Sequence, residues 1–158
     1  EISSGLVGSE MCIRDRAVVS SMQGGGLNLD TMHAGGLCGM ATFLDPSITT
    51  ADNLSGQVVA RKGDLPEIHT AVSIEVSLMD HMVAGDGEVP EKIHPLRNNE
   101  MLMLNVATAT SVGVTRNAEK GRTDLDLRLP ICADKGQRIS LSRRIGSRWR
   151  LIGYGTIV

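Results

Sequence analysis

The feature of this sequence that most limits its fold is the strict alternation of apolar and polar residues from Val72 to Leu78. The letters VSIEVSL put valine, isoleucine and leucine on one side and serine and glutamate on the other. Successive side chains of a β-strand point to opposite faces, so this pattern predicts a strand buried on one face. No stretch shows the 3.6-residue apolar repeat of an amphipathic helix. The sequence therefore predicts an all-β protein.

Short apolar runs separated by turn residues indicate how many strands to expect. Turns are predicted at Asp45-Pro46, Asn98-Asn99 and Gly146-Ser147, and a loop at Gly85 to Pro90. About six short strands after Ile68, with turn residues between them, predict a closed antiparallel barrel. With aromatics at only 2% of the chain, its core must be packed by Val, Ile, Leu and Met. Strands are predicted at Ala17 to Ser21, Leu37 to Leu44, Gln57 to Ala60, Val72 to Leu78, Met101 to Val106, Ser111 to Thr115, Leu125 to Leu129, Ile139 to Arg144 and Arg148 to Ile157.

Two of these strands carry more specific expectations. Met101 to Val106 is a continuous apolar run, which suits a strand buried on both faces. Leu125, Leu127 and Leu129 alternate with charged residues up to Pro130, which is typical of a strand.

The chain divides into three parts. Residues 1–16 are set aside, because Leu6 to Asp15, LVGSEMCIRD, back-translates to a string that resembles the end of a transposase-type sequencing adapter. Lys62-Gly63-Asp64 and Pro66 interrupt the strand pattern and indicate a linker. We therefore expect one module over residues 17–65 and a second over residues 66–158.

Net charge and cysteine content limit which partners and which cellular compartment fit this chain. The net charge is −2, so a nucleic-acid site would have to be a local patch. No apolar run approaches the roughly 20 residues that span a bilayer, and no secretory signal is present. Cys12, Cys38 and Cys132 are widely spaced and form no disulfide framework, which fits a reducing cytoplasm.

No catalytic or metal-binding constellation stands out. His33, His69, His81 and His94 are isolated and lack metal-ligand spacing. The run Gly24 to Gly26 lacks the Lys-Ser or Lys-Thr of a phosphate-binding loop and is better interpreted as a turn. The sequence predicts neither a catalytic residue nor a metal site within these residues.

The candidate site is a basic hairpin. Arg143, Arg144, Arg148 and Arg150 flank the predicted Gly146-Ser147 turn and are expected to form one positive patch. Guanidinium groups bind phosphates bidentately, which favours contact with an RNA backbone. Trp149 between two of the arginines is equally typical of an anchor for a protein partner. A third interpretation is a solvated edge hairpin whose charges prevent aggregation.

Longer motifs point to a family. Ser142 to Gly155, SRRIGSRWRLIGYG, resembles the C-terminal signature of the gamma subunit of archaeal and eukaryotic translation initiation factor 2. Met101 to Gly113 resembles a strand pair of that family's third domain, and His33 to Gly63 the end of its second. Departures such as Ala41 and Ala107, where members tend to have glycine, put local geometry in doubt. The ending directly after the last strand is typical of archaeal members.

The resemblance implies a structure and a role. The fold would be a Greek-key barrel of the translational-GTPase third-domain type, preceded by part of the second-domain barrel. Members bind GTP and Mg²⁺ through a domain that is not in this chain. They carry initiator methionyl-tRNA to the small ribosomal subunit as the core of a heterotrimer with alpha and beta subunits. Two alternatives stay open: a scaffold barrel packing on its own GTPase domain, and the barrels of an elongation-factor-type GTPase.

Overall fold

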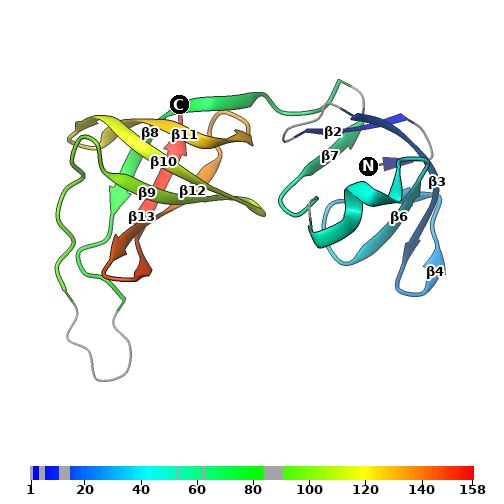
Figure 1. The fold of residues 1–158 in the computed structure, drawn as a ribbon, viewed down its shortest axis with the longest axis horizontal. Coiled ribbons are helices and arrows are strands. Elements are labelled where there is room, and N and C mark those ends of the chain that lie inside the picture. Colours follow the sequence, from blue (N-terminus) through cyan, green and yellow to red (C-terminus); the bar gives the residue numbers. More distant parts are fainter. Residues whose placement is uncertain (1, 4–5, 11–14, 53, 62, 84–90) are drawn as a thin grey trace. The chain divides into compact units, whose positions relative to one another are not determined.

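The computed structural model describes residues 2–3, 6–10, 15–52, 54–61, 63–83 and 91–158, in two compact units (Figure 1). The units are Glu1–Pro66 and Glu67–Val158. The second unit contains the strands β8 (Ile68–Leu78), β9 (Met101–Val106), β10 (Ala109–Glu119), β11 (Arg122–Cys132), β12 (Arg138–Ile145) and β13 (Arg148–Ile157).

These six strands of the second unit close into an antiparallel barrel, in the order β10-β11-β8-β13-β12-β9. Hairpins connect β9 to β10, β10 to β11 and β12 to β13, whereas β12 returns to lie beside β9. The order β12-β9-β10-β11 is a Greek key. The predicted all-β fold and closed antiparallel barrel are confirmed.

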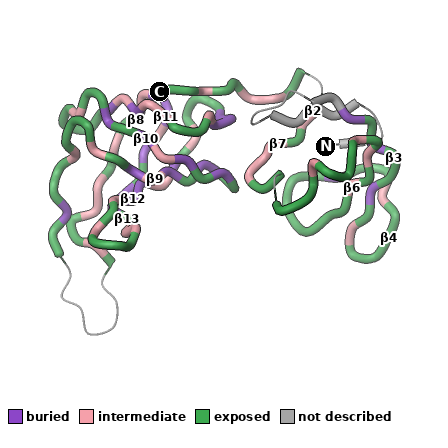
Figure 2. The backbone as a smooth tube through the Cα atoms, in the orientation of Figure 1, coloured by how far each residue is buried: buried purple, intermediate pink, exposed green. Residues whose placement is uncertain are grey.

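The interior of the barrel is aliphatic. Along β8, Val72 and Ile74 are buried and Glu75 is exposed, as the VSIEVSL alternation predicts. Figure 2 shows buried and exposed residues alternating along the barrel strands. The core cluster comprises Val72, Ile74, Ile93, Leu102, Leu104, Val106, Leu125, Ile131, Ala133, Ile139, Leu141, Ile152 and Ile157.

One detailed expectation for the barrel strands was wrong, and a second strand departs from simple alternation. β9 is buried on one face only, because Leu102 and Leu104 point into the core while Met101 is 52% exposed. On β11, Leu125 is fully buried but Leu129 is 51% exposed. Leu129 lies between Asp126 and Ile131, where the pairing of β11 with β8 shifts register, and such an irregularity locally interrupts the alternation of faces. The predicted loop at 85–90 lies outside the described residues.

The β9–β10 turn contains a residue that departs from the family pattern. Ala107 follows Val106, the last residue of β9, and adopts a φ of 50°. This left-handed conformation costs a residue with a Cβ roughly 1–2 kcal/mol and costs glycine almost nothing. Alanine at this position therefore strains the turn, whereas the glycine that family members tend to have would not.

The first unit is built on an open sheet. Its strand order is β4-β3-β2-β7, with β6 also paired to β3 and with β1 and β5 forming a separate pair. Gly25 and Gly26 link β3 to β4 with φ values of 59° and 80°, the values of a tight hairpin turn. The elements are β1 (Ile2–Ser3), β2 (Leu6–Glu10), β3 (Asp15–Gly24), β4 (Leu27–Asn28), β5 (Thr31–Met32), β6 (Cys38–Thr42), the 3₁₀ segment η1 (Pro46–Asp52) and β7 (Val58–Arg61).

The predicted Asp45-Pro46 turn is present before η1. The Asp45 Oδ1 accepts a hydrogen bond from the Ser47 backbone N–H at 2.8 Å, which closes an Asx turn. This bond to the Ser47 backbone also lowers the pKa of Asp45 from its ordinary value.

One strand of the sheet in the first unit, β2, lies within residues 1–16, which resemble translated adapter sequence. β2 pairs with both β3 and β7, through Leu6–Val18 and Val7–Arg61 among others. The adapter origin of residues 1–16 is a statement about the DNA and stays a prediction. If it holds, the place of β2 between β3 and β7 belongs to another strand in the intact protein.

Candidate functional site

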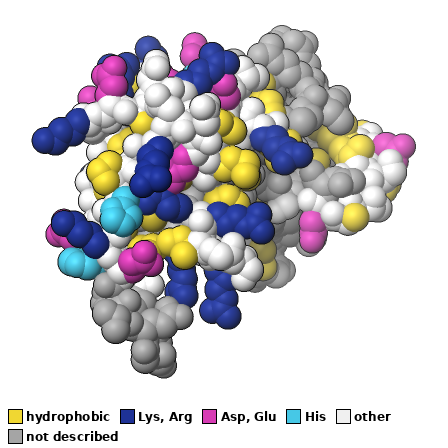
Figure 3. Space-filling view, turned by 60° about the vertical axis from the view of Figure 1, so that its left-hand side comes forward, with side chains coloured by type: hydrophobic (Ala, Val, Ile, Leu, Met, Phe, Trp, Pro, Cys, Tyr) yellow, Lys and Arg dark blue, Asp and Glu magenta, His cyan; other side chains and the backbone are white. Residues whose placement is uncertain are grey.

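The predicted basic hairpin is present at the ends of β12 and β13. Gly146 and Ser147 form a two-residue turn between paired Ile145 and Arg148, and Gly146 has the positive φ of 59° that such turns require. Lys and Arg side chains are spread over the surface that comes forward in Figure 3, where apolar side chains lie among them.

The register of the hairpin divides its arginines between two faces. Arg143 pairs with Arg150, and Arg144 pairs with Trp149. Arg143 also pairs with Leu102 of β9, whose side chain is fully buried. Paired residues share a face of the sheet, so Arg143 and Arg150 continue the inner face of the barrel at its end, whereas Arg144 and Trp149 lie on the outer face. The four arginines therefore do not share one surface.

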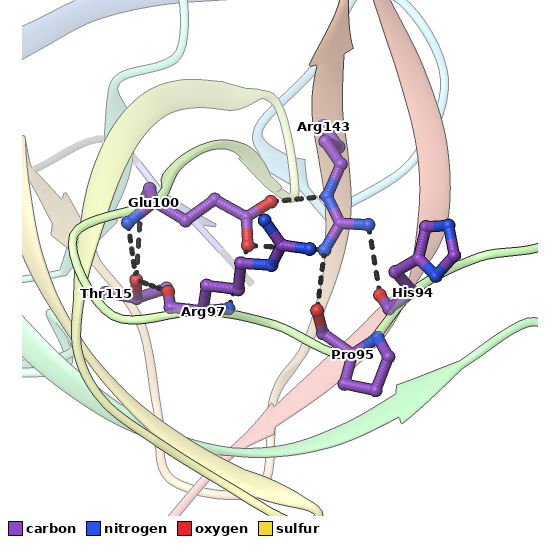
Figure 4. A network of polar contacts seen from close by, with 6 residues as sticks. All are labelled: His94, Pro95, Arg97, Glu100, Thr115 and Arg143. Atoms are coloured by element: carbon purple, nitrogen blue, oxygen red, sulfur yellow. Dashed lines mark hydrogen bonds and ion pairs between the residues drawn. The ribbon is translucent and has the colours of Figure 1, made fainter.

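Arg143 binds within the protein (Figure 4). Its Nε donates to Glu100 Oε1, and its Nη2 donates to Glu100 Oε2 at 3.2 Å. Its Nη1 donates to the His94 carbonyl at 3.0 Å and its Nη2 to the Pro95 carbonyl at 3.3 Å. The side chains of Arg143 and Glu100 are each 17% exposed. This arginine fastens the 94–100 segment across the end of the barrel.

A buried threonine locks the same segment from the other side. The Thr115 hydroxyl donates to the Arg97 carbonyl at 2.5 Å and accepts from the Glu100 N–H at 2.9 Å. The Arg97 N–H donates to Glu100 Oε2 at 3.0 Å. The Asn99 N–H donates to the Thr115 carbonyl at 2.8 Å, within the predicted Asn98-Asn99 turn. The backbone of this turn is therefore fixed to β10.

An open depression of about 550 Å³ lies between this turn and β12. Three guanidinium groups and one carboxylate, that of Glu100, line it, so its walls carry excess positive charge. Arg97 and Arg144 are both exposed, and within the described ranges neither forms an ion pair. The lining residues are His94, Pro95, Arg97, Asn98, Asn99, Glu100, Met101, Arg143 and Arg144.

The remaining predicted site residues, Arg148, Trp149 and Arg150, lie at the start of β13. Arg148 is exposed beside the turn, and Arg150 and Trp149 are half-buried. Of the predicted set, only Arg143 and Arg144 line the depression. Arg97, Glu100 and Thr115 were not expected, because they are distant in sequence from the hairpin and belong to no recognised motif.

The other candidate groups do not form a second site among the residues that the structure describes. The His69 ring is hydrogen-bonded to the Ala133 carbonyl at 3.0 Å. No group of His, Cys, Asp or Glu suited to a metal occurs among the residues that the structure describes. The turn at Gly25 and Gly26 leads into a strand instead of a helix, so the residues present do not fit a nucleotide-binding loop. No helix in the described part of the chain is long and apolar enough to cross a membrane.

Comparison with a family model and comparison with individual proteins indicate the same family. Residues 70–157, which lie within the barrel unit, match the family described as "Initiation factor eIF2 gamma, C terminal". The chain is 50% identical over 139 residues to translation initiation factor 2 subunit gamma of Methanococcus aeolicus, covering 88% of this chain and 33% of the relative. It is 48% identical to the subunits of that name from Methanococcus maripaludis, covering 89% and 34%, and Methanocaldococcus jannaschii, covering 88% and 33%. The chain thus spans about a third of the length of these relatives.

Proposed function

The chain belongs to the family of translation initiation factor 2 gamma subunits, and from this membership we propose that it takes part in translation initiation in the cytoplasm. The observation that supports the proposal most strongly is the match over residues 70–157, which extends along the closed barrel from β8 to β13. In this proposal the barrel serves a factor that uses GTP and Mg²⁺ to deliver initiator methionyl-tRNA to the small ribosomal subunit.

The proposed partners follow from the same membership. The alpha and beta subunits would complete a heterotrimer, and the initiator tRNA and the small ribosomal subunit would be its RNA-containing partners. The described residues do not fit a nucleotide or a metal, so we assign no step of GTP hydrolysis to them. Their contribution is to bind and to position.

An RNA contact at the hairpin forms part of the proposal. Arg144 and Arg148 are exposed, and Trp149 lies half-buried beside Arg144. Guanidinium groups bind phosphates and an indole ring can stack on a base, so the outer face that carries Arg144 and Trp149 suits RNA, and Arg148 beside the turn can add a second charge. Arg143 is excluded from that role because its guanidinium group is already bound to Glu100 and two carbonyls. The scaffold alternative would make the exposed arginines contacts to another part of the gamma subunit.

A graft tests the proposed function. Residues 67–158 replace the matching segment of the Methanococcus aeolicus gamma subunit, which is reconstituted with its alpha and beta subunits. We expect GTP-dependent retention of initiator methionyl-tRNA on small ribosomal subunits to equal that of the unmodified factor. A graft that folds, as judged by Trp149 fluorescence, yet delivers no tRNA would contradict the proposal.

The same graft separates the RNA interpretation from the scaffold interpretation. Replacing Arg144 and Arg148 by alanine removes two exposed charges from the hairpin. An RNA contact predicts weaker, less salt-dependent binding to small subunits by the intact heterotrimer. A scaffold predicts unchanged binding at every salt concentration, with a lower melting temperature of the gamma subunit.

A further inference from the structure

We propose that the depression between residues 94–101 and β12 is a binding site for a phosphate group of an RNA backbone, held by Arg97 and Arg144. The inference rests on the proposed role in translation and names a site that the hairpin alone does not provide. It moves the main phosphate contact from the tip of the hairpin to the end of the barrel.

The charge of the depression is the first argument. Glu100 is the only carboxylate that lines it, and that carboxylate is bound to Arg143. The positive charges of Arg97 and Arg144 are thus left uncompensated by the described residues around them. In Figure 4 the Arg97 side chain extends toward the Arg143–Glu100 pair. Such a cavity favours an anionic group.

The rigidity of the walls is the second argument. The carbonyl and N–H of Arg97 are held by Thr115 and Glu100, and the Asn98 Oδ1 accepts from the Ala118 N–H at 2.7 Å. Arg144 projects from β12, which is paired on both sides, with β9 and with β13. A ligand bound here would not have to order the backbone, so binding carries a smaller entropic cost.

The lining also indicates the class of ligand. Two forked guanidinium groups and the polar Asn98 and Asn99 surround an open, shallow space. Planar guanidinium forks match the oxygens of a phosphodiester. A protein partner would be expected to insert an apolar or aromatic anchor into a deeper pocket, and Pro95 and Met101 are the only apolar residue types among those that line this open one. These features favour an RNA backbone over an acidic peptide.

Within this site Arg143 is a positioning residue. It does not offer its charge to a ligand, since Glu100 neutralises it. Its bonds to the His94 and Pro95 carbonyls instead hold the segment from which Arg97 projects. Replacing it would disturb the wall itself, so the test leaves it unchanged.

The test compares two double variants of the full 158-residue chain. Arg97→Ala with Arg144→Ala removes the two proposed ligands. Arg122→Ala with Arg128→Ala, both exposed on β11, makes the same change in net charge away from the depression. Binding of a short fluorescein-labelled RNA hairpin is measured by anisotropy between about 50 and 200 mM salt.

The expected result is a change in salt dependence confined to one variant. Each lost phosphate contact lowers the slope of log affinity against log salt by about 0.7 to 0.9, and because Arg97 and Arg144 hold one phosphate group, their double variant should lose about that much. The Arg122/Arg128 variant should keep the slope of the unmodified chain. Circular dichroism and Trp149 fluorescence verify that both variants fold.

The other outcomes are distinguishable. RNA binding that is equally weakened by both variants, or by neither, overturns this site; the Arg144/Arg148 variant of the graft then tests the hairpin separately. No RNA binding by the unmodified chain overturns the RNA contact as well. An acidic peptide that displaces the RNA from the unmodified chain but not from the Arg97/Arg144 variant overturns the assignment to RNA. Displacement by millimolar inorganic phosphate alone identifies a free-anion site and overturns the assignment to an RNA backbone.

Discussion

At the scale of single residues, two adjacent arginines of β12 have opposite roles. Arg143 turns inward and binds Glu100 and two carbonyls, whereas Arg144 lies on the outer face and lines the depression. A side chain with several charge-assisted hydrogen bonds contributes to stability, and an exposed one with none contributes little.

Replacing Arg143 by alanine should therefore destabilise the second unit by about 3 kcal/mol, since it leaves the half-buried Glu100 carboxylate without its cation and removes the donors to two carbonyls. Urea unfolding followed by Trp149 fluorescence measures the effect, because this is the only tryptophan and it lies in β13. Arg144→Ala is the matched control and should change the free energy of unfolding by less than about 0.5 kcal/mol. Equal effects of the two substitutions would show that Arg143 does not fasten the 94–100 segment.

Ala107 offers a second prediction at this scale. Because its φ is 50°, Ala107→Gly should stabilise the second unit, by about 1 kcal/mol. Thr108→Gly, one position along the same turn, is the control, since Thr108 is not among the residues with positive φ. The same urea titration compares them, and a gain at Thr108 as large as that at Ala107 would contradict the explanation.

At the scale of elements, side chains tie three neighbouring strands of the barrel together. The Asp124 carboxylate on β11 accepts a hydrogen bond from Ser73 of β8 at 2.5 Å and from Asn117 of β10 at 3.1 Å. The bond from Ser73, followed by that from Asn117, lowers the pKa of Asp124 below its ordinary value of 3.8, and Arg122 and Arg116 add to the effect. Lower proton affinity in the folded state makes this tie a source of stability above that pH.

Ser73→Ala should raise the pKa of Asp124 toward its ordinary value, as measured by NMR titration of the carboxyl carbon. The loss of stability relative to the unmodified chain should be fully present above pH 3.8 and should shrink as the pH falls through the lowered pKa of Asp124. Ser77→Ala, on the outer part of the same strand, should leave the titration of Asp124 unchanged. A pKa that stays low in the Ser73 variant would assign the effect to Asn117 and the arginines instead.

The elements also show how far the sequence could predict this structure. The alternation of apolar and polar residues was sufficient to predict β8, and the turn residues Gly146 and Ser147 were sufficient to predict the hairpin. The faces of the arginines could not be predicted, because they depend on register with β9 and on an irregularity between Leu141 and Ser142. Arg143 binds Glu100, which lies 43 residues earlier in the chain, and no local pattern identifies that partner. The exposure of Leu129 has the same kind of cause.

At the scale of the whole chain, the two units differ in how much core they have. Among the side chains that the structure describes, which exclude those of residues 1–16, the barrel buries a cluster of 13 residues and the first unit a cluster of Val19, Met22 and Met32. The barrel is closed, and the sheet of the first unit is open. Leu37 and Phe43 of the first unit are 94% and 79% exposed. Apolar burial is the main source of stability, so the units should unfold separately.

Hydrogen exchange followed by mass spectrometry tests this difference. Amides of β8 to β13 should exchange slowly, at a rate set by global unfolding of the barrel, while those of β3, β6 and β7 should exchange faster. The internal control is the barrel turn at Lys120 and Gly121, which should exchange as fast as the first unit. Equal protection across both units would mean that they unfold as one.

The origin of residues 1–16 is tested at the same scale. Sequencing the gene from genomic DNA prepared without adapters should show different codons before Ala17. Identical codons in that DNA would make β2 a native strand. Deleting residues 1–16 should leave the Trp149-monitored unfolding of the second unit unchanged, because that unit has its own closed sheet and core.

The tight packing of β13 has a consequence for how the gene can change. A Cβ added to Gly153 would lie 2.2 Å from the Ser77 carbonyl oxygen, and one added to Gly155 would lie 2.8 Å from Ile74 Cδ1, whereas Tyr154 between them is 43% exposed. Every change in the first or second base of a glycine codon replaces the glycine. Under selection for folding, the Gly153 codon should accept third-base changes only, because the added Cβ meets backbone atoms. The Gly155 codon should be less strictly held, because the added Cβ meets the end of the Ile74 side chain, and the tyrosine codon between them should be the least constrained.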